Sequence, residues 1–272
     1  MAEASRNAGA VATAPLLGPD EPKPFEVANR AGSSPVFLTC EHAGRRIPRA
    51  LGDLGVPGHE MDRHIAYDIG AEDLARRLSA RLDAPLVLQP YSRLVVDCNR
   101  PPESPQCVPE ISDGTAIPAN RGISPLAHRQ RVEDIHTPFH GTVAGLLDAR
   151  QTAGQPALLV AVHSFTAELA ARPEPRPWHV GLLYNRDDRL ARHLMAGLEV
   201  HASSYLSTFN EPYTVEDDSD FTIPVHGEKR GIPHVLLEVR NDELATPAGR
   251  ETWTGILAVV IDHVLANQEG LL

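Results

Sequence analysis

Residues 160–165, Val160-Ala161-Val162-His163-Ser164-Phe165, form an apolar run that is interrupted by a histidine. Two other apolar runs lead to chemically reactive side chains, since residues 36–40 lead to His42 and residues 234–237 lead to Glu238. Short apolar runs of this kind are typical of buried strands. Ligands of open α/β sheets gather beyond the carboxyl ends of the strands. The pattern therefore predicts two imidazoles and a carboxylate at one sheet edge, as in a metal-dependent hydrolase.

The rest of the chain alternates between patterns of strands and patterns of amphipathic helices. Predicted strands cover residues 35–40, 86–88, 93–98, 157–162, 179–184 and 234–239. Predicted helices cover residues 69–82, 125–149 with a kink at Pro138, 188–200, and 249–267 with Ile256, Val259, Val260 and Val264 on its inner side. Residues 101–125 read as a long Pro-rich loop, and residues 216–220 as a solvated acidic loop. This order predicts a single α/β domain, with a mixed, mostly parallel sheet and helices on both faces.

Composition excludes several classes of protein. The net charge of −11 argues against nucleic-acid binding. The sequence contains no run of 18 apolar residues, so we expect no membrane span. The three cysteines form no C-x-x-C pair, so we expect buried thiols rather than disulfides or zinc ligands. Residues 1–22 read as a disordered tail of a cytoplasmic protein, followed by a catalytic domain over residues 23–272. The sequence carries no signal of an oligomeric state.

Candidate metal ligands lie near two of the apolar runs, the one at residues 36–40 and the one at residues 160–165, and in the segment between these runs. His42 and His163 are the predicted imidazole ligands, and hydrogen-bonded core histidines are the alternative for both. The third ligand is open between Asp68 and Glu41. Because adjacent side chains of an extended segment point to opposite faces, Glu41 and His42 are poorly placed to share one ion. Asp68 is therefore preferred, with a helix N-cap as its alternative role.

Candidate catalytic and substrate-binding residues follow two other apolar runs. A lone carboxylate at Glu238 is costly to bury unless it is paired or functional, so we expect it to be the general base. Arg240 is a candidate for substrate binding or for a structural ion pair with Glu238. Asn99 and Arg100 suit a substrate carboxylate, because the guanidinium group offers a planar fork of donors. Arg93 is a candidate for stabilising an oxyanion or binding the same carboxylate, and a surface charge is its alternative.

A helix rich in histidine is a weaker candidate. His136 and His140 have i,i+4 spacing and therefore share a helix face, and His128 precedes them. The glutamate of H-E-x-x-H is absent and Pro138 lies between the two histidines. We therefore expect a surface or pocket-lining role. Neither a G-x-S-x-G nor a phosphate-binding glycine loop occurs.

Five blocks taken together resemble the N-formylglutamate amidohydrolase family over residues 35–265. They are residues 39–48, 68–71, 92–100, 163–165 and 231–240, and they occur in the family's order. The family is similar in fold to zinc carboxypeptidases and aspartoacylases. The resemblance implies Zn²⁺ held by His42 and His163, a substrate carboxylate held by Asn99 and Arg100, and Glu238 as base. It also implies hydrolysis of an N-formyl or N-acyl amino acid, foremost N-formyl-L-glutamate to glutamate and formate.

The chain also departs from the carboxypeptidase pattern. Arg45 stands three residues after His42, where those enzymes carry a glutamate ligand, and a Pro-rich insertion follows Arg100. These departures leave the carboxylate ligand and the acyl group open. The alternatives are a carboxypeptidase- or aspartoacylase-like zinc hydrolase acting on another N-acyl amino acid, and a non-catalytic protein that binds a small carboxylate.

Overall fold

Seven strands form one sheet in the order β1-β3-β2-β6-β9-β7-β8 in the computed structural model, which describes residues 15–267 and 269–271. The neighbours β3-β2-β6-β9 are parallel, β1 and β7 meet β3 and β9 in antiparallel fashion, and β8 is parallel to β7. The predicted mixed, mostly parallel sheet is therefore confirmed. The strands are β1 (Glu26–Ala28), β2 (Val36–Cys40), β3 (Leu86–Leu88), β6 (Leu158–Phe165), β7 (Val180–Leu183), β8 (Ser207–Phe209) and β9 (His234–Arg240).

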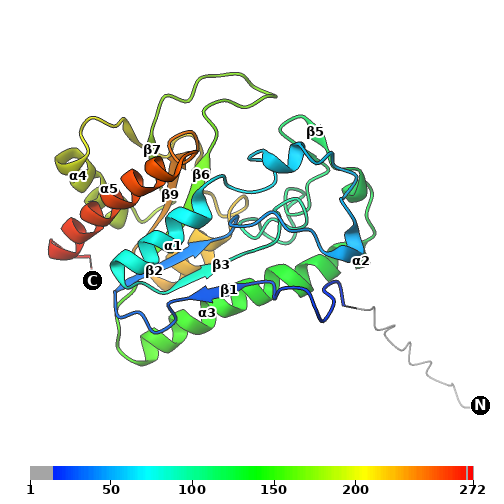
Figure 1. Cartoon of the computed structure of the whole chain (residues 1–272). Coiled ribbons are helices and arrows are strands. Elements are labelled where there is room, and N and C mark those ends of the chain that lie inside the picture. Colours follow the sequence, from blue (N-terminus) through cyan, green and yellow to red (C-terminus); the bar gives the residue numbers. More distant parts are fainter. Residues whose placement is uncertain (1–14, 268, 272) are drawn as a thin grey trace, which may run out of the picture.

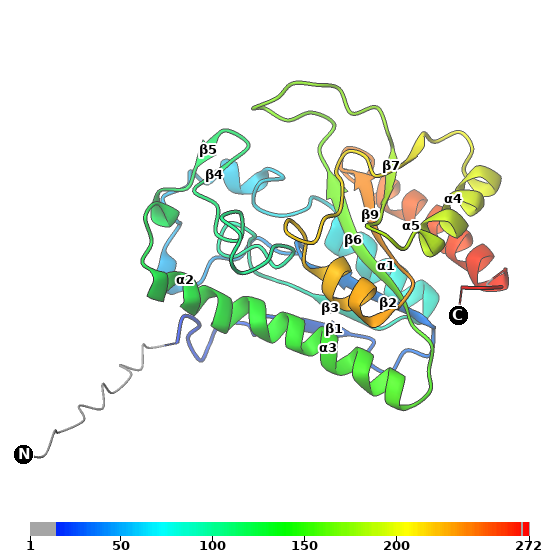
Figure 2. The same ribbon diagram turned by 180° about the vertical axis from the view of Figure 1, so that it is seen from behind.

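Helices cover both faces of this sheet (Figures 1 and 2). α1 (Ala71–Leu82) and α4 (Arg189–His201) pack on one face, and α5 (Pro247–Ala266) packs against both of them. α3 (Thr137–Thr152), which follows α2 (Pro125–Arg131), packs on the other face. Successive residues of β2 therefore serve two cores, with Leu38 packed towards α1 and Phe37 towards α3. This two-sided burial explains why the strands read as continuous apolar runs.

The helical segment is not kinked at Pro138 as predicted, and instead contains a π-helical turn at Val132–His136, between α2 and α3. Proline lacks an N–H and removes one i→i−4 hydrogen bond from a helix. The wider turn directly before Pro138 accommodates the missing donor, so the helical segment continues in nearly the same direction (Figure 2).

Residues 93–98 do not form the predicted strand. They make successive turns, with Leu94, Val95 and Val96 buried in the core on the α3 side. Two of their carbonyl groups accept hydrogen bonds from side chains, since Arg131 donates to the Val95 carbonyl over 3.0 Å and Asn120 to the Leu94 carbonyl over 2.8 Å. The apolar run thus reflected burial, which does not distinguish a strand from a buried loop.

Other boundaries move by one to three residues, with two consequences. β6 extends to Phe165, so His163 lies within the strand and not beyond its end. Val259, expected on the inner side of α5, is 42% exposed, whereas Val260 and Val264 are buried. The long loop at 101–125 contains a small hairpin of β4 (Ile111–Ser112) and β5 (Thr115–Ala116). The cysteines are free and buried, as predicted.

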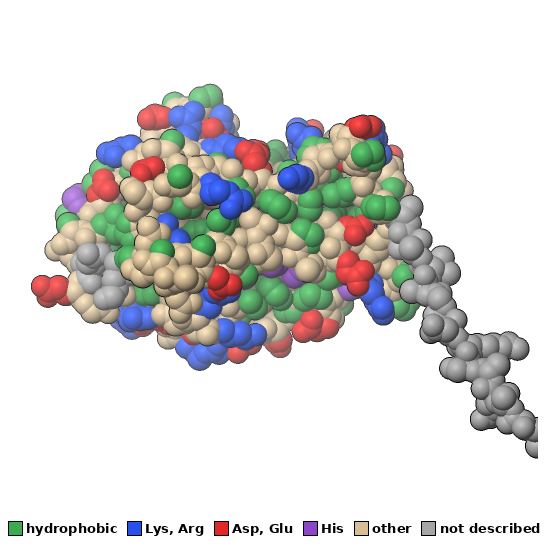
Figure 3. All heavy atoms as spheres, turned by 90° about the horizontal axis from the view of Figure 1, so that it is seen from below, with side chains coloured by type: hydrophobic (Ala, Val, Ile, Leu, Met, Phe, Trp, Pro, Cys, Tyr) green, Lys and Arg blue, Asp and Glu red, His purple; other side chains and the backbone are tan. Residues whose placement is uncertain are grey.

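The predicted disordered tail is described only in part, because residues 1–14 lie outside the described residues. Residues 15–22 pack against the domain: Leu16 is buried, and the Pro22 carbonyl accepts a hydrogen bond from the Tyr91 hydroxyl at 2.7 Å. No helix in the described part of the chain has the length and apolar character needed to cross a bilayer. Acidic and basic side chains are interspersed on the face shown in Figure 3.

Candidate metal centre and pocket

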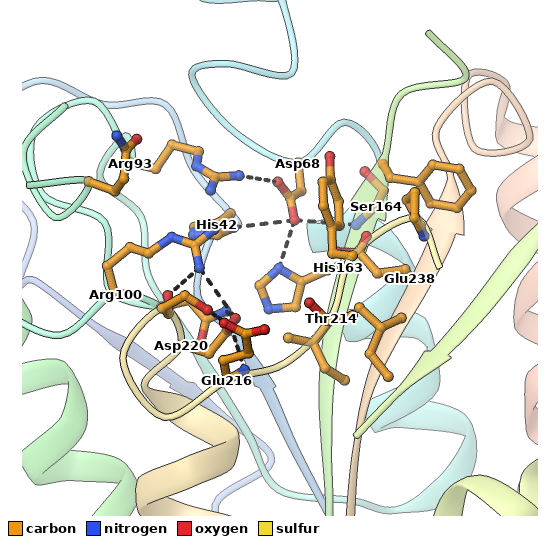
Figure 4. A pocket seen from close by; sticks show the side chains of 18 of the residues that line it. His42, Asp68, Arg93, Arg100, His163, Ser164, Thr214, Glu216, Asp220 and Glu238 are labelled. Atoms are coloured by element: carbon orange, nitrogen blue, oxygen red, sulfur yellow. Dashed lines mark hydrogen bonds and ion pairs between the residues drawn. The ribbon is translucent and has the colours of Figure 1, made fainter. Parts of the chain in front are cut away.

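A pocket of about 720 Å³ opens at the carboxyl ends of the parallel strands β2, β6 and β9 (Figure 4). All the predicted site residues except Arg240 line it, namely His42, Asp68, Arg93, Asn99, Arg100, His163 and Glu238. The segment 210–220 supplies much of the remaining wall. The sheet topology therefore brings together side chains that are up to 196 positions apart in a protein of 272 residues.

Three buried groups in this pocket form a candidate metal centre. His42 Nδ1 and His163 Nδ1 lie 3.4 Å and 2.8 Å from the same oxygen, Oδ2 of Asp68. Ligand atoms of the three residues all lie within 4.8 Å of one another. Two imidazoles and one carboxylate with room for a water molecule are a common ligand set of catalytic zinc. The residues present therefore fit a zinc ion.

Local backbone structure places Asp68 between the two histidines. Its backbone N–H donates to the carbonyl of His42 over 2.9 Å, which ties the segment before α1 to the end of β2. Gly70, with φ +82°, is the N-cap residue of α1, and a side chain there would collide with Leu244. Asp68 therefore does not cap the helix, and its carboxylate faces the pocket (Figure 4).

A second pair of carboxylates holds the outer nitrogen of each imidazole. His42 Nε2 lies 2.7 Å from Asp97 Oδ1, and His163 Nε2 lies 2.8 Å from Glu41 Oε2. Such contacts fix the ring orientation and increase the basicity of metal-ligating histidines. Glu41 therefore contacts the far side of the His163 ring, and Asp68 is the carboxylate that faces both Nδ1 atoms.

These contacts stabilise positive charge at the centre. Burial alone would lower the pKa of His163, but its hydrogen bonds to Asp68 and Glu41 outweigh burial and raise that pKa well above its ordinary value. Burial alone would raise the pKa of Asp68, but His42 and His163 hold it below its ordinary value. A cation among these groups is thus favoured, whether it is a proton on His163 or a metal ion.

Glu238 stands beside the centre on the neighbouring strand. The parallel register of β6 and β9 pairs His163 with Glu238. The carboxyl group is buried, and within the described residues its Oε2 has no hydrogen-bond partner. Burial raises the pKa of Glu238 to about 8. The alternative, a structural ion pair with Arg240, is absent from the described part of the chain, because Arg240 donates to Asp242 and to the Pro177 carbonyl instead.

The two arginines of the pocket differ in how their donors are used. Arg93 donates through Nε and Nη2 to Asp97 Oδ2 over 3.0 Å and 2.7 Å, and through Nη1 to Asp68 over 3.3 Å. Arg100 uses Nη1 for the Ser219 carbonyl and for Asp220 (Figure 4). Its Nε and Nη2 make no hydrogen bond within residues 15–267 and 269–271, so one edge of the Arg100 fork remains free for a ligand.

Asn99 lines the pocket, but its amide mainly joins two loops. Its Nδ2 donates to Asp220 Oδ1 over 3.0 Å, and its Oδ1 accepts from the backbone N–H of Thr222 over 3.2 Å. Asp220 was expected in a solvated acidic loop, yet it is 6% exposed. Asn99 and Arg100 donate hydrogen bonds to this carboxylate and hold the end of the loop in place. The acidic composition of the loop therefore predicted solvent exposure wrongly for its last residue, Asp220.

Three other predicted residues lie elsewhere. Arg240 points away from the pocket, donating to Asp242 over 2.7 Å and to the Pro177 carbonyl over 3.0 Å. His136 and His140, expected at the surface or in the pocket lining, are buried beneath the loop that carries Asn99 and Arg100.

Sequence reasoning also missed two contributors to the site. Asp97 contacts His42, and the only sign of this role in the sequence is that an acidic residue follows the apolar run Leu94-Val95-Val96. Tyr213 lines the pocket from a segment without any pattern that predicts function, and its hydroxyl accepts a hydrogen bond from Arg176 over 2.9 Å.

Similarity to known proteins shows the family and the fold of this chain. Residues 34–245 match the family model described as N-formylglutamate amidohydrolase. A crystal structure of gene product Atu2144 from Agrobacterium tumefaciens is 36% identical, with a TM-score of 0.89, over 93% of this chain and 99% of that chain. An N-formylglutamate amidohydrolase from Ralstonia eutropha JMP134 is 17% identical, with a TM-score of 0.65, over 91% of this chain and 99% of that one. LapA aminopeptidase from Legionella pneumophila is 11% identical, with a TM-score of 0.36, over 88% and 54% of the two chains. No curated protein matches.

Proposed function

The chain belongs to the N-formylglutamate amidohydrolase family, and we propose that it is a zinc-dependent enzyme that hydrolyses the amide bond of an N-formyl or N-acyl amino acid. N-formyl-L-glutamate, which would yield glutamate and formate, is the first substrate to test. The observation that carries the proposal is the buried group of His42, Asp68 and His163, with Glu238 one strand away. A binding protein without catalysis has no need for a buried carboxyl group that lacks a partner beside a metal site.

The residues divide the chemistry among them. His42, Asp68 and His163 would hold the zinc ion, while Asp97 and Glu41 keep the two imidazole rings in place. A zinc ion in this place would act as a Lewis acid and would lower the pKa of a nearby water molecule towards about 7.

Glu238 would move the proton in this reaction. Its carboxylate would accept a proton from the water molecule that attacks the acyl carbon, and would then donate that proton to the departing amine. Burial favours a protonated Glu238, whereas a divalent cation nearby would favour the carboxylate, so the two influences on its pKa oppose each other.

Arginine side chains would position the substrate. The free edge of Arg100 offers two donors to the substrate carboxylate. Arg93, held against Asp97 and Asp68, would place positive charge near the oxygen that becomes negative during attack. Arg240 has no part in this scheme because its guanidinium group lies outside the pocket lining.

A metal assay coupled to a substrate screen tests the proposal. Protein purified without chelator should carry about one equivalent of zinc, measured by mass spectrometry of the metal. The screen should compare N-formyl-L-glutamate with its N-acetyl analogue, with N-formyl-L-methionine and with a dipeptide ending in glutamate, and detect the released amine. Hydrolysis of only the dipeptide would indicate a carboxypeptidase. Protein that neither retains zinc nor hydrolyses any of these compounds would contradict the proposal.

A further inference from the structure

Three buried histidines lie directly beneath the loop that carries Arg100. His136 ends the π-helical turn, His140 lies on α3, and His226 belongs to a second π-helical turn at Ile223–Gly227. All three are at most 6% exposed, and none of them lines the pocket. The metal centre described above does not include them. Their burial therefore needs another explanation.

Hydrogen bonds define the tautomer of each ring. His136 Nε2 lies 3.0 Å from the Arg100 carbonyl, and His140 Nε2 lies 2.6 Å from the Cys98 carbonyl. Because a carbonyl oxygen only accepts, both Nε2 atoms carry the proton. Neutral His140 then accepts at Nδ1, so His226 donates to it from Nε2 over 3.0 Å. The chain of donors runs from His226 through His140 to the loop.

Burial keeps this cluster neutral. It lowers the pKa of His136, lowers that of His140 well below its ordinary value, and lowers that of His226 to about 4. His226 Nδ1 has no hydrogen-bond partner among the described residues, which agrees with a bare nitrogen at the start of the chain of donors. A neutral cluster donates one hydrogen bond per ring and attracts no counter-ion.

The same cluster also contacts Phe221, the residue that follows the pocket-lining segment 210–220. The ring of Phe221 packs 4.3 Å from that of His140 and 4.8 Å from that of His136, measured between ring centroids. The Phe221 backbone N–H and its neighbour at Thr222 both point to Asn99 Oδ1, at 3.4 Å and 3.2 Å. The cluster thus supports both loops that meet at Asn99.

We propose that His136 and His140 are positioning residues that aim the free edge of Arg100 into the pocket by holding the carbonyl groups on either side of Asn99. The inference rests on the proposed function of Arg100 as the carboxylate-binding residue. Both ends of Arg100 are then fixed, its backbone by His136 and its Nη1 by Ser219 and Asp220. A shift of about 1 Å in such a group reduces substrate positioning markedly.

Kinetics of His136→Leu test this role. We expect the KM for N-formyl-L-glutamate to rise about 10-fold, with kcat within about 3-fold and zinc content unchanged. His136→Gln, whose amide donates a hydrogen bond from a similar place, should restore KM to within about 3-fold. His128→Leu is the matched control on α2, and it should behave as the wild type, because within the described residues the Cys98 and Arg100 carbonyls accept from His140 and His136 and not from His128.

A double-mutant cycle separates positioning from a general loss of structure. If His136 acts through Arg100, then His136→Leu should change KM by less than about 2-fold when Arg100→Met is already present. Equal effects in the two backgrounds would overturn the inference. So would an unchanged KM in His136→Leu, or a loss of zinc in that variant.

A measurement on the wild-type protein needs neither a variant that folds nor a substrate. ¹⁵N chemical shifts of the histidine rings at neutral pH should show neutral Nε2–H tautomers at His136 and His140. An Nδ1–H tautomer at either residue would overturn the inference, because the bond to the loop carbonyl would then be impossible. Absence of hydrolysis by the wild type would contradict the proposed function instead, and would leave these tautomers as the test of the cluster.

Discussion

Replacement of Glu238 by glutamine should stabilise the zinc-free protein while it slows catalysis. The two side chains have nearly the same shape, but glutamine carries no charge. Glu238 is 6% exposed, and its Oε2 has no partner within the described residues. The native protein therefore favours a protonated Glu238, and ionisation of this group works against folding.

The sign and size of the effect follow from the raised pKa. Burial raises the pKa of Glu238 from the ordinary 4.5 to about 8. A raised pKa contributes stability that is complete below pH 4.5 and is lost as the pH rises through about 8. At about 1.36 kcal/mol per pKa unit, the wild type loses about 5 kcal/mol of unfolding free energy from this group. Glu238→Gln escapes this loss, so its advantage should grow from a small value near pH 4.5 to about 5 kcal/mol above pH 8.

Urea denaturation in the presence of a chelator, monitored by circular dichroism between pH 5 and pH 9, measures this difference. Glu216→Gln is the matched control, because Glu216 is exposed at the rim of the same pocket. That substitution should leave the pH dependence of the unfolding free energy unchanged. A constant difference between Glu238→Gln and the wild type across the pH range would refute the reasoning. With zinc restored, Glu238→Gln should bind the metal and yet be at least about 100-fold slower.

Four further outcomes are expected. Asp68→Asn should reduce the zinc content of the purified protein below about one tenth of the wild-type value, and full retention of zinc would remove Asp68 from the ligand set. Zinc binding at pH 7 should release at least one proton, because the pKa of His163 is raised well above its ordinary value and the metal displaces that proton; calorimetry in two buffers of different ionisation enthalpy measures it, and identical heats would contradict it. Glu41→Gln should weaken zinc affinity by about 10-fold or more in competition with a chelator, whereas an unchanged affinity would mean that Glu41 does not orient His163. Arg100→Met should raise the KM for N-formyl-L-glutamate by about 30-fold, and a KM near that of the wild type would assign the substrate carboxylate to another group.

The apolar patterns predicted most of the sheet, because parallel strands buried on both faces leave a continuous signal in the sequence. The same signal was wrong at residues 93–98, where a buried loop is as apolar as a strand. What distinguishes the two is the source of hydrogen bonds, and here it is Arg131 and Asn120, which lie more than twenty positions further along the chain. A local pattern contains no information about such partners.

The two candidate imidazole ligands were predictable because each lies at or near the carboxyl end of a strand, and parallel strands end at one edge; Asp68 lies in the loop before α1 and was chosen over Glu41 on side-chain direction. The residues that support them were harder to predict. Asp97 and Glu41 act on the outer faces of the imidazole rings, and which carboxylate meets which ring depends on side-chain directions in three dimensions. Asp220 was misjudged because composition suggested solvent, whereas Asn99, 121 positions away, holds it in the interior.

The histidine spacing in 136–140 was read correctly, but the expected surface or pocket-lining position was wrong, because both rings are buried beneath the loop that carries Asn99 and Arg100. The two rings do lie near each other, with centroids 4.5 Å apart. Their Nε2 atoms are directed at backbone carbonyls and not at a common ligand. Spacing reports which side chains are neighbours on a helix, but it does not report what faces that helix.

The pairing of His163 with Glu238 across β6 and β9 has an evolutionary implication. Adjacent strands are separated by about 4.8 Å, a spacing imposed by main-chain hydrogen bonding and therefore indifferent to the identity of the side chains. Related proteins can therefore differ in the loops around the pocket, and in the molecules that they accept, while the main-chain spacing between the positions of His163 and Glu238 stays the same.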